Sequence, residues 1–248
     1  MKKIGIIGGL AWPSTVDYYR LLCKLANQRF RIAGEDPPFS TPPMVVESLN
    51  IKETKALRGM DDEKSWEPYD SKFRDAFVRL KNAGADFGMI ASNTPHMRLH
   101  GITRGLDLPV VSILEATSKA VASNGGRAAL VLGTPITMRS PIYPQALQKQ
   151  GISALPQVSD EEIAEIEQLI DVDLYQGVTD RARDRIVEIS RKHVHSPATD
   201  LVCLACTELP LAFPEHADSV FFRHDGIGFI NTIAAHVEMV LGEVFFKG

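Results

Sequence analysis

Short runs of apolar residues alternate along this chain with longer segments in which apolar side chains recur every three or four positions. The short runs are typical of strands buried on both faces of a parallel sheet, and the longer segments are typical of amphipathic helices. The pattern predicts strands at 3–7, 44–48, 85–91, 109–113, 127–132, 200–205 and 220–222. It predicts helices at 14–29, 69–83, 115–123, 140–150, 160–170, 176–192 and 229–244. This alternation indicates an α/β fold with parallel sheets.

Glycine-containing turns follow two of the predicted strands. Gly8 and Gly9 follow the first strand, and Gly133 follows the strand at 127–132. The stretch from Ser14 to Asp17 resembles a capping box, so the first turn is predicted to lead into a helix. Residues at a helix N-terminus favour the binding of anions, and Gly133 with the residues after it repeats this corner. The glycines after the first strand do not have the G-x-G-x-x-G spacing of dinucleotide-binding turns, so a dinucleotide site is poorly supported. A small carboxylate suits this corner equally well.

The same order of features occurs twice along the chain. In each half, a strand, a glycine turn and a helix are followed by a second buried strand that ends in a small polar residue, Ser92 in one half and Cys206 in the other. We therefore predict two similar α/β domains, one formed by residues 1–115 plus 225–248 and the other by residues 116–224. Ser92 and Cys206 are predicted to face each other across one cleft.

Cys206 lies at the carboxyl end of a buried strand, which is where open α/β folds place their sites. A helix starting next to it would lower the pKa of the thiol. The alternative is a buried structural cysteine, since free cysteine behaves as a small hydrophobe. Cys203 completes a C-x-x-C, but zinc is disfavoured because no second pair and no nearby histidine is present. Cys203 is predicted to be core and Cys206 to be exposed.

Composition narrows the class of protein. The chain has 248 residues, 44% of them hydrophobic and 23% charged, which is typical of a globular protein. A net charge of −4 gives no electrostatic footprint for nucleic acid, and no stretch approaches the length of a transmembrane helix. Three cysteines favour a reducing compartment, so a cytoplasmic protein is expected. A Pro-rich loop is predicted at 34–43 and a mobile polar loop at 59–66.

Four motifs in this order resemble the aspartate/glutamate racemase family, whose members work without pyridoxal phosphate. They are the opening segment at 5–19, the first catalytic strand and its end at 84–96, the corner at 132–138 with Tyr143, and the second catalytic strand end at 206–211. The resemblance implies two α/β domains related by a pseudo-twofold axis, with the active site in the cleft between them, and usually a homodimer.

The resemblance also implies a reaction without cofactor or metal. Two acid/base groups, here Cys206 and Ser92, would flank the α-carbon of an acidic amino acid such as aspartate or glutamate and exchange its proton from opposite faces. Residues at the matching positions would hold this small-molecule substrate: Leu10, Asn93, Thr94, Pro95, Thr134 and Thr207.

Several positions depart from the family's pattern. Ser92 stands where cysteine is usual, and a hydroxyl is a poor proton shuttle unless a base activates it. The chain is then a natural variant like the threonine-bearing members, a catalytically disabled form, or a one-base enzyme. His96 is a candidate base for Ser92 or a packing histidine. Residues 150–191 contain no lysine, Asn50 replaces a residue that is often acidic, and the segment 222–228 is unlike its counterpart. Arg223 and His224 are candidates for compensating charge or solvated loop residues.

Two other functions compete with a racemase. Arylmalonate decarboxylases resemble this fold and keep only the second cysteine, a pattern that a lone Cys206 fits. A non-catalytic protein that binds a dicarboxylate is favoured by Ser92 alone. The polar stretch Ser92–Thr94 argues for the racemase, because the decarboxylase site needs small apolar residues there.

Overall fold

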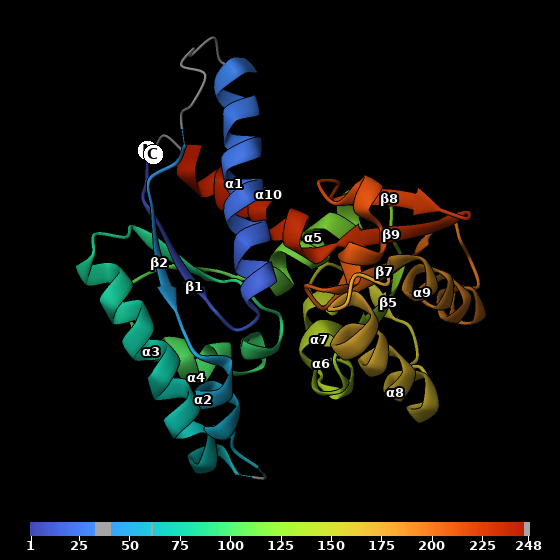
Figure 1. Ribbon diagram of the computed structural model, residues 1–248, viewed down its shortest axis with the longest axis horizontal. Coiled ribbons are helices and arrows are strands. Elements are labelled where there is room, and N and C mark those ends of the chain that lie inside the picture. Colours follow the sequence, from blue (N-terminus) through green and yellow to red (C-terminus); the bar gives the residue numbers. More distant parts are fainter. Residues whose placement is uncertain (33–40, 61, 246–248) are drawn as a thin grey trace. The chain divides into compact units, whose positions relative to one another are not determined.

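The structure is a computed structural model that describes residues 1–32, 41–60 and 62–245. The chain divides into two compact units, Met1–Ser112 with Val237–Gly248, and Ile113–His236. Each unit has its own sheet (Figure 1). The predicted α/β fold with parallel sheets is confirmed.

The first unit is built on a four-stranded sheet in the order β2-β1-β3-β4, and all of its pairings are parallel. Its strands are β1 (Ile4–Gly8), β2 (Met44–Ser48), β3 (Phe87–Ile90) and β4 (Val110–Val111). Its helices and 3-10 turns are α1 (Trp12–Ile32), α2 (Ile51–Ala56), η1 (Glu63–Trp66), α3 (Glu67–Asn82), η2 (Thr94–Arg98) and α4 (Leu99–Thr103).

Alternation along β1 places α3 and α1 on opposite faces of this sheet (Figure 1). A Cβ added to Gly5 would lie 3.2 Å from the Cβ of Leu80 on α3, whereas one added to Gly8 would lie 2.5 Å from Cγ2 of Thr15 on α1. Glycine is therefore required where the two helices approach the strand closely. This close approach fixes the position of the chain as it leaves β1.

The second unit has a five-stranded sheet in the order β6-β5-β7-β9-β8, in which only the β8–β9 pairing is antiparallel. Its strands are β5 (Ala128–Gly133), β6 (Ser153–Ala154), β7 (Asp200–Ala205), β8 (Phe221–His224) and β9 (Ile227–Asn231). Its helices and turns are α5 (Ile113–Ser123), α6 (Pro135–Arg139), α7 (Ile142–Gln148), α8 (Asp160–Gln168), the π-helical η3 (Leu169–Leu174), α9 (Thr179–His193), η4 (Leu209–Ala212) and η5 (Pro214–His216). The last helix, α10 (Thr232–Phe245), continues from this unit into the first.

One hydrophobic core of the second unit packs on one face of β7. Val202, Leu204 and Cys206 share the parity that packs into this core, together with residues of α8, η3, α9 and η4. Cys203 has the opposite parity. The two cysteines of the C-x-x-C therefore lie on different faces of the strand, which argues against a redox pair.

Several sequence predictions need correction. Helix α1 begins at Trp12, so Ser14 lies inside the helix and the predicted capping box does not mark its start. The helix expected at 229–244 begins only at Thr232, because the preceding residues form β9. The segments α2, α6 and β6 were not predicted, since they are short and carry little periodicity.

The domain limits also differ from the prediction. Because β9 pairs with β7, residues 225–236 lie with the second unit and not with the first. The predicted loop at 59–66 contains η1, with residue 61 outside the described residues, and most of the predicted loop at 34–43 lies outside them as well. No helix among the described residues is long and apolar enough to cross a membrane.

Candidate active site

The thiol of Cys206 is paired with a buried carboxylate. Cys206 follows β7 directly, and its Sγ lies 2.9 Å from Oε2 of Glu208, to which it donates. The hydroxyl of Thr207 donates to the same oxygen at 3.0 Å. All three residues are buried, with Glu208 only 5% exposed. Two hydrogen-bond donors therefore stabilise one carboxylate beside the candidate catalytic thiol.

Burial and the negative charge of Glu208 raise the pKa of Cys206 well above its usual range. The predicted lowering by a helix N-terminus is wrong, because the chain beyond Cys206 forms only the short turn η4, and the backbone hydrogen bond from Glu208 lowers the pKa less than the other effects raise it. Cys206 is thus a neutral thiol near pH 7. In this state it is ready to donate a proton and has an acceptor for its own proton at hand.

Cys203 is a core residue, as predicted. It is fully buried, and burial raises its pKa to about 12. The predicted exposure of Cys206 is wrong, since it is 7% exposed. What distinguishes the two thiols is therefore the carboxylate partner of Cys206 and not solvent contact.

The π-helical segment η3 brings further charge close to Cys206. Asp171 in η3 contributes to the raised pKa of Cys206. Burial and then the negative charge of Glu208 raise the pKa of Tyr175, which directly follows η3. Segment η3 packs on the core that holds Cys206. Such π-helical turns often occur at functional sites. Glu208, Asp171 and Tyr175 are not among the site residues predicted from the sequence. Only Glu208 carried a signal, its place next to Thr207.

Ser92 directly follows β3 and the bend residue Ala91, and it is half-buried. The His96 ring contacts the backbone of Ser92, since Nδ1 of His96 lies 2.9 Å from the carbonyl oxygen of Ser92. Burial lowers the pKa of His96 to about 4, so the ring is neutral and donates this hydrogen bond through Nδ1–H. This contact favours the interpretation of His96 as a packing residue that holds the chain in place. It does not favour His96 as a base for the Ser92 hydroxyl.

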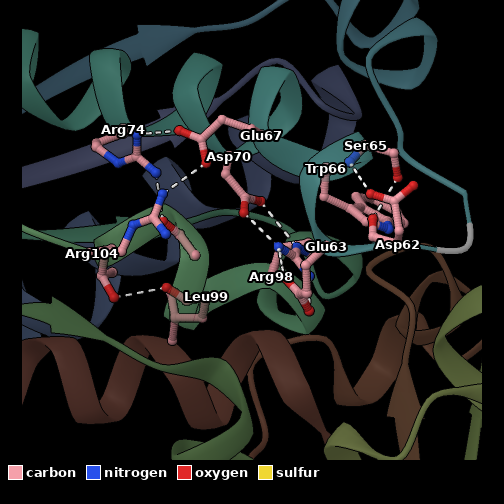
Figure 2. Close-up of polar contacts among 12 residues, drawn as sticks. Asp62, Glu63, Ser65, Trp66, Glu67, Asp70, Arg74, Arg98, Leu99 and Arg104 are labelled. Atoms are coloured by element: carbon pink, nitrogen blue, oxygen red, sulfur yellow. Dashed lines mark hydrogen bonds and ion pairs between the residues drawn. The ribbon is translucent and has the colours of Figure 1, made fainter.

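An ion-pair network anchors the turn that follows Ser92 (Figure 2). Arg98, at the end of η2, contacts the buried Asp70 of α3 through Nε and Nη2, at 3.1 and 2.7 Å. The same guanidinium binds Glu63 through Nη1 and Nη2, at 3.0 and 2.7 Å, and lies over the ring of Trp66. Paired bidentate contacts of this kind fix geometry as well as charge. The network therefore ties η1 and α3 to the segment that carries Ser92.

The remaining predicted binding residues of the first unit lie near the same strand ends. Asn93 and Pro95 are buried and Thr94 half-buried, and the last two open η2. Leu10 is buried in the core cluster with α3, so its side chain is a packing residue. The predicted anion corner at Gly9 is partly occupied, because its N–H donates to Oγ1 of Thr15 at 2.9 Å.

Sheet register brings each set of predicted residues to one edge of its own sheet. In the second unit, Gly133 pairs with Ala205, so Thr134 and Cys206 leave neighbouring strands side by side. The Thr134 hydroxyl lies 3.0 Å from that of Thr137. In the first unit, the N–H of Ala91 donates to the carbonyl of Ile7 at 2.9 Å, so Leu10 and Ser92 likewise follow adjacent strands. Both edges are carboxyl edges, where α/β folds bind ligands.

Comparison with known proteins identifies the family. The family model described as Asp/Glu/Hydantoin racemase matches residues 7–240. The chain belongs to this family. The match includes both Ser92 and Cys206, so the two candidate acid/base positions lie inside the family region.

Relatives of the racemase family match nearly the whole chain. The broad specificity amino-acid racemase RacX of Bacillus subtilis (strain 168) is 29% identical over 83% of this chain and 85% of its own. The crystal structure of an aspartate racemase homologue from Pyrococcus horikoshii OT3 has a TM-score of 0.78 at 28% identity and covers 98% of this chain and 99% of that one. An aspartate racemase from Picrophilus torridus, 21% identical, matches in fold with a TM-score of 0.71 over 98% of this chain and 94% of its own.

Proposed function

We propose that this protein is a cofactor-independent amino-acid racemase in which Cys206 exchanges a proton at one face of the substrate α-carbon and Ser92 acts at the opposite face. The observation that carries the proposal is the buried thiol–carboxylate pair of Cys206 and Glu208, 2.9 Å apart at the carboxyl end of a parallel strand. Family membership supports the reaction class.

The pair of Cys206 and Glu208 supplies the proton chemistry for one face. In one direction the thiol gives its proton to the planar carbanion while the protonated carboxyl of Glu208 gives a proton to the sulfur, so no thiolate is left in the buried site. In the other direction Glu208 takes the thiol proton as the sulfur removes the α-proton, so the Cα–H bond breaks and no net charge is created. At the other face the Ser92 hydroxyl gives its proton to the carbanion and regains one from water, and its weak acidity makes that half of the reaction slower than with a thiol.

The substrate carboxylate is assigned to groups at the two strand edges. Hydroxyls of Thr94, Thr134 and Thr207, the amide of Asn93 and nearby backbone N–H groups are suitable donors. Leu10 and Pro95 would shape the same site by packing, because the Leu10 side chain lies in the core.

We propose an acidic amino acid, aspartate or glutamate, as the first candidate substrate. A second candidate, a neutral or basic amino acid, is favoured by the charges near Cys206: Glu208 and Asp171 are both negative and would repel a second carboxylate placed beside them. The relative described as a broad specificity amino-acid racemase supports testing this wider range.

The test is exchange of the α-proton in D₂O, followed by NMR with both enantiomers of aspartate and glutamate and then of the other amino acids. The parent protein is expected to incorporate deuterium, and Cys206→Ala is expected to lose this activity. Cys23→Ala is the matched control, because Cys23 is a free thiol on α1, a helix that holds neither catalytic position. Exchange that persists in Cys206→Ala, or no exchange with any amino acid, contradicts the proposal.

The single cysteine at the two catalytic positions also favours a one-base decarboxylation as a second candidate reaction. Release of CO₂ from substituted malonates, lost on Cys206→Ala and without α-proton exchange of amino acids, would favour the decarboxylase. Binding of a dicarboxylate with neither reaction, unchanged by Ser92→Cys, would identify a binding protein.

We further propose that the protein is a cytoplasmic homodimer. Three free thiols in a chain of this length fit a reducing compartment. The outer face of α1 exposes Trp12, Val16 and Tyr19, which recur at helical spacing and form an apolar row that a second copy would cover. Light scattering is expected to give twice the mass of the chain, and Val16→Asp to reduce it. A monomeric parent protein contradicts the dimer.

A further inference from the structure

A cluster of two histidines and one carboxylate lies in the second unit, in a part of the chain that the proposed reaction does not use. Glu215 and His216 belong to η5, and His224 ends β8, inside the segment 222–228 that departs from the family's pattern. We propose that Glu215, His216 and His224 bind a divalent transition-metal cation of the zinc type.

The ligand atoms of these three side chains already lie close together. They are all within 4.8 Å of one another. Oε1 of Glu215 is 3.8 Å from Nδ1 of His224 and 3.9 Å from Nε2 of His216. Zinc–ligand bonds of about 2.0–2.1 Å place neighbouring ligand atoms about 3.3 Å apart in a tetrahedron. Side-chain rotations that shorten these separations by about 0.5–1.5 Å would enclose an ion.

Aromatic packing holds the two imidazoles in position before any ion binds. The His216 ring stacks on Phe222 with centroids 4.4 Å apart, and the His224 ring meets Phe213 edge to face at 5.4 Å. Both phenylalanines are buried. The rings thus rest on the core, while Glu215 is exposed and free to rotate toward them. A site whose ligands are fixed in this way loses little side-chain entropy on binding.

The donor set selects the class of ion. Two imidazole nitrogens with one carboxylate oxygen suit zinc and its transition-metal neighbours, whereas magnesium and calcium prefer oxygen ligands. Three protein ligands at a half-exposed position leave a place for water. The ion would join η5 to the β8–β9 edge of the sheet, so its expected effect is on stability and not on the reaction at Cys206.

The experiment is titration of the intact, chelator-treated protein with ZnCl₂, by calorimetry and by thermal unfolding near pH 7.5. The parent protein is expected to bind one zinc ion and to show a rise in Tm with zinc concentration. His216→Gln and His224→Gln are expected to weaken binding at least tenfold and to remove the rise in Tm. Thermal unfolding without zinc shows whether each variant is folded.

His193→Gln is the matched control. His193 also pairs with a carboxylate, since its Nε2 lies 2.8 Å from Oε2 of Glu162, but it has no place in the three-ligand cluster. Its zinc binding is expected to equal that of the parent protein. Absence of zinc binding to the parent overturns the proposal. So does binding that persists in both folded cluster variants, or that is lost in Cys206→Ala, because the ion would then lie elsewhere.

Discussion

At the scale of single residues, the protonation of Cys206 is controlled by its neighbour. The thiol is neutral because burial and the Glu208 carboxylate both disfavour the thiolate. This arrangement differs from thiols activated by a helix N-terminus, which lose their proton near neutral pH. Here the thiolate is formed only when its proton has an acceptor, and Glu208 is placed to be that acceptor.

Glu208→Gln is therefore expected to lower the pKa of Cys206. The substitution removes the negative charge that disfavours the thiolate and keeps a similar shape. Thiolate absorbance at 240 nm, taken as the difference from Cys206→Ala in the same background, measures this pKa. Asp171→Asn should shift it in the same direction by less, because Asp171 is the smaller contribution. An unchanged or raised pKa in Glu208→Gln would show that the carboxylate does not control the thiol.

His96 makes stability depend on pH. Its pKa falls from 6.5 in the unfolded chain to about 4 in the folded one, so the unfolded state binds more protons between these values. The contribution is complete above pH 6.5 and is lost as the pH falls toward 4. Between pH 7 and 4.5 the parent protein should lose about 2 kcal/mol more free energy of unfolding than His96→Gln. Urea unfolding measures both, and equal losses would refute the neutral, buried ring.

At the scale of elements, a buried ion pair between Arg98 and Asp70 ties η2 to α3, and Arg74 on α3 donates to the carbonyl of Gly101 in α4 at 2.7 Å. A Cβ added to Gly101 in α4 would lie 2.0 Å from Oδ2 of Asp70, the oxygen that binds Nη2 of Arg98. Glycine is thus required at position 101 by the close approach of Asp70, whose contact with Arg98 is drawn in Figure 2. Displacing a partner of a buried pair leaves an uncompensated charge, which is strongly destabilising.

Gly101→Ala is expected to lower the free energy of unfolding by roughly 2–4 kcal/mol. Gly242→Ala in α10 is the matched control, because nothing lies within 4 Å of its added Cβ. That change should raise stability by roughly 0.5–1 kcal/mol, since alanine favours helix more than glycine does. Denaturant unfolding of both variants measures the contrast. A Gly101→Ala protein as stable as the parent would show that the Arg98–Asp70 pair tolerates displacement.

Sequence patterning predicted the long, regular elements well and the irregular ones poorly. The strand predicted at 200–205, apolar from Leu201 onward, has the length and composition of a buried strand, and it is a strand with these bounds. The predicted closing helix at 229–244 includes the last three residues of β9, because Ile227–Asn231 and the helix after it are both apolar and period alone does not separate them. The π-helical η3 has no sequence signature, so the charges that it brings near Cys206 could not be predicted.

At the scale of the whole molecule, both units share the same arrangement of strand ends. In each unit, two neighbouring parallel strands end at the same edge of the sheet, one in a glycine corner and the other next to a candidate acid/base residue. The duplication was visible in the sequence because both halves keep the same order of motifs. The distances between the reacting groups could not be predicted from the sequence, because the Cys206–Glu208 contact depends on the turn after β7 and not on spacing alone.

The most direct test of the central claim is the position of deuterium during the first turnovers in D₂O, with one enantiomer of the best substrate. Two groups on opposite faces predict that the product enantiomer carries deuterium while the remaining substrate keeps its proton. Ser92→Cys should accelerate this reaction, and Cys206→Ser should slow it strongly. Early deuterium in the recovered substrate equal to that in the product, or a Ser92→Cys protein no faster than the parent, would contradict the assignment of Ser92 and Cys206 to the two faces.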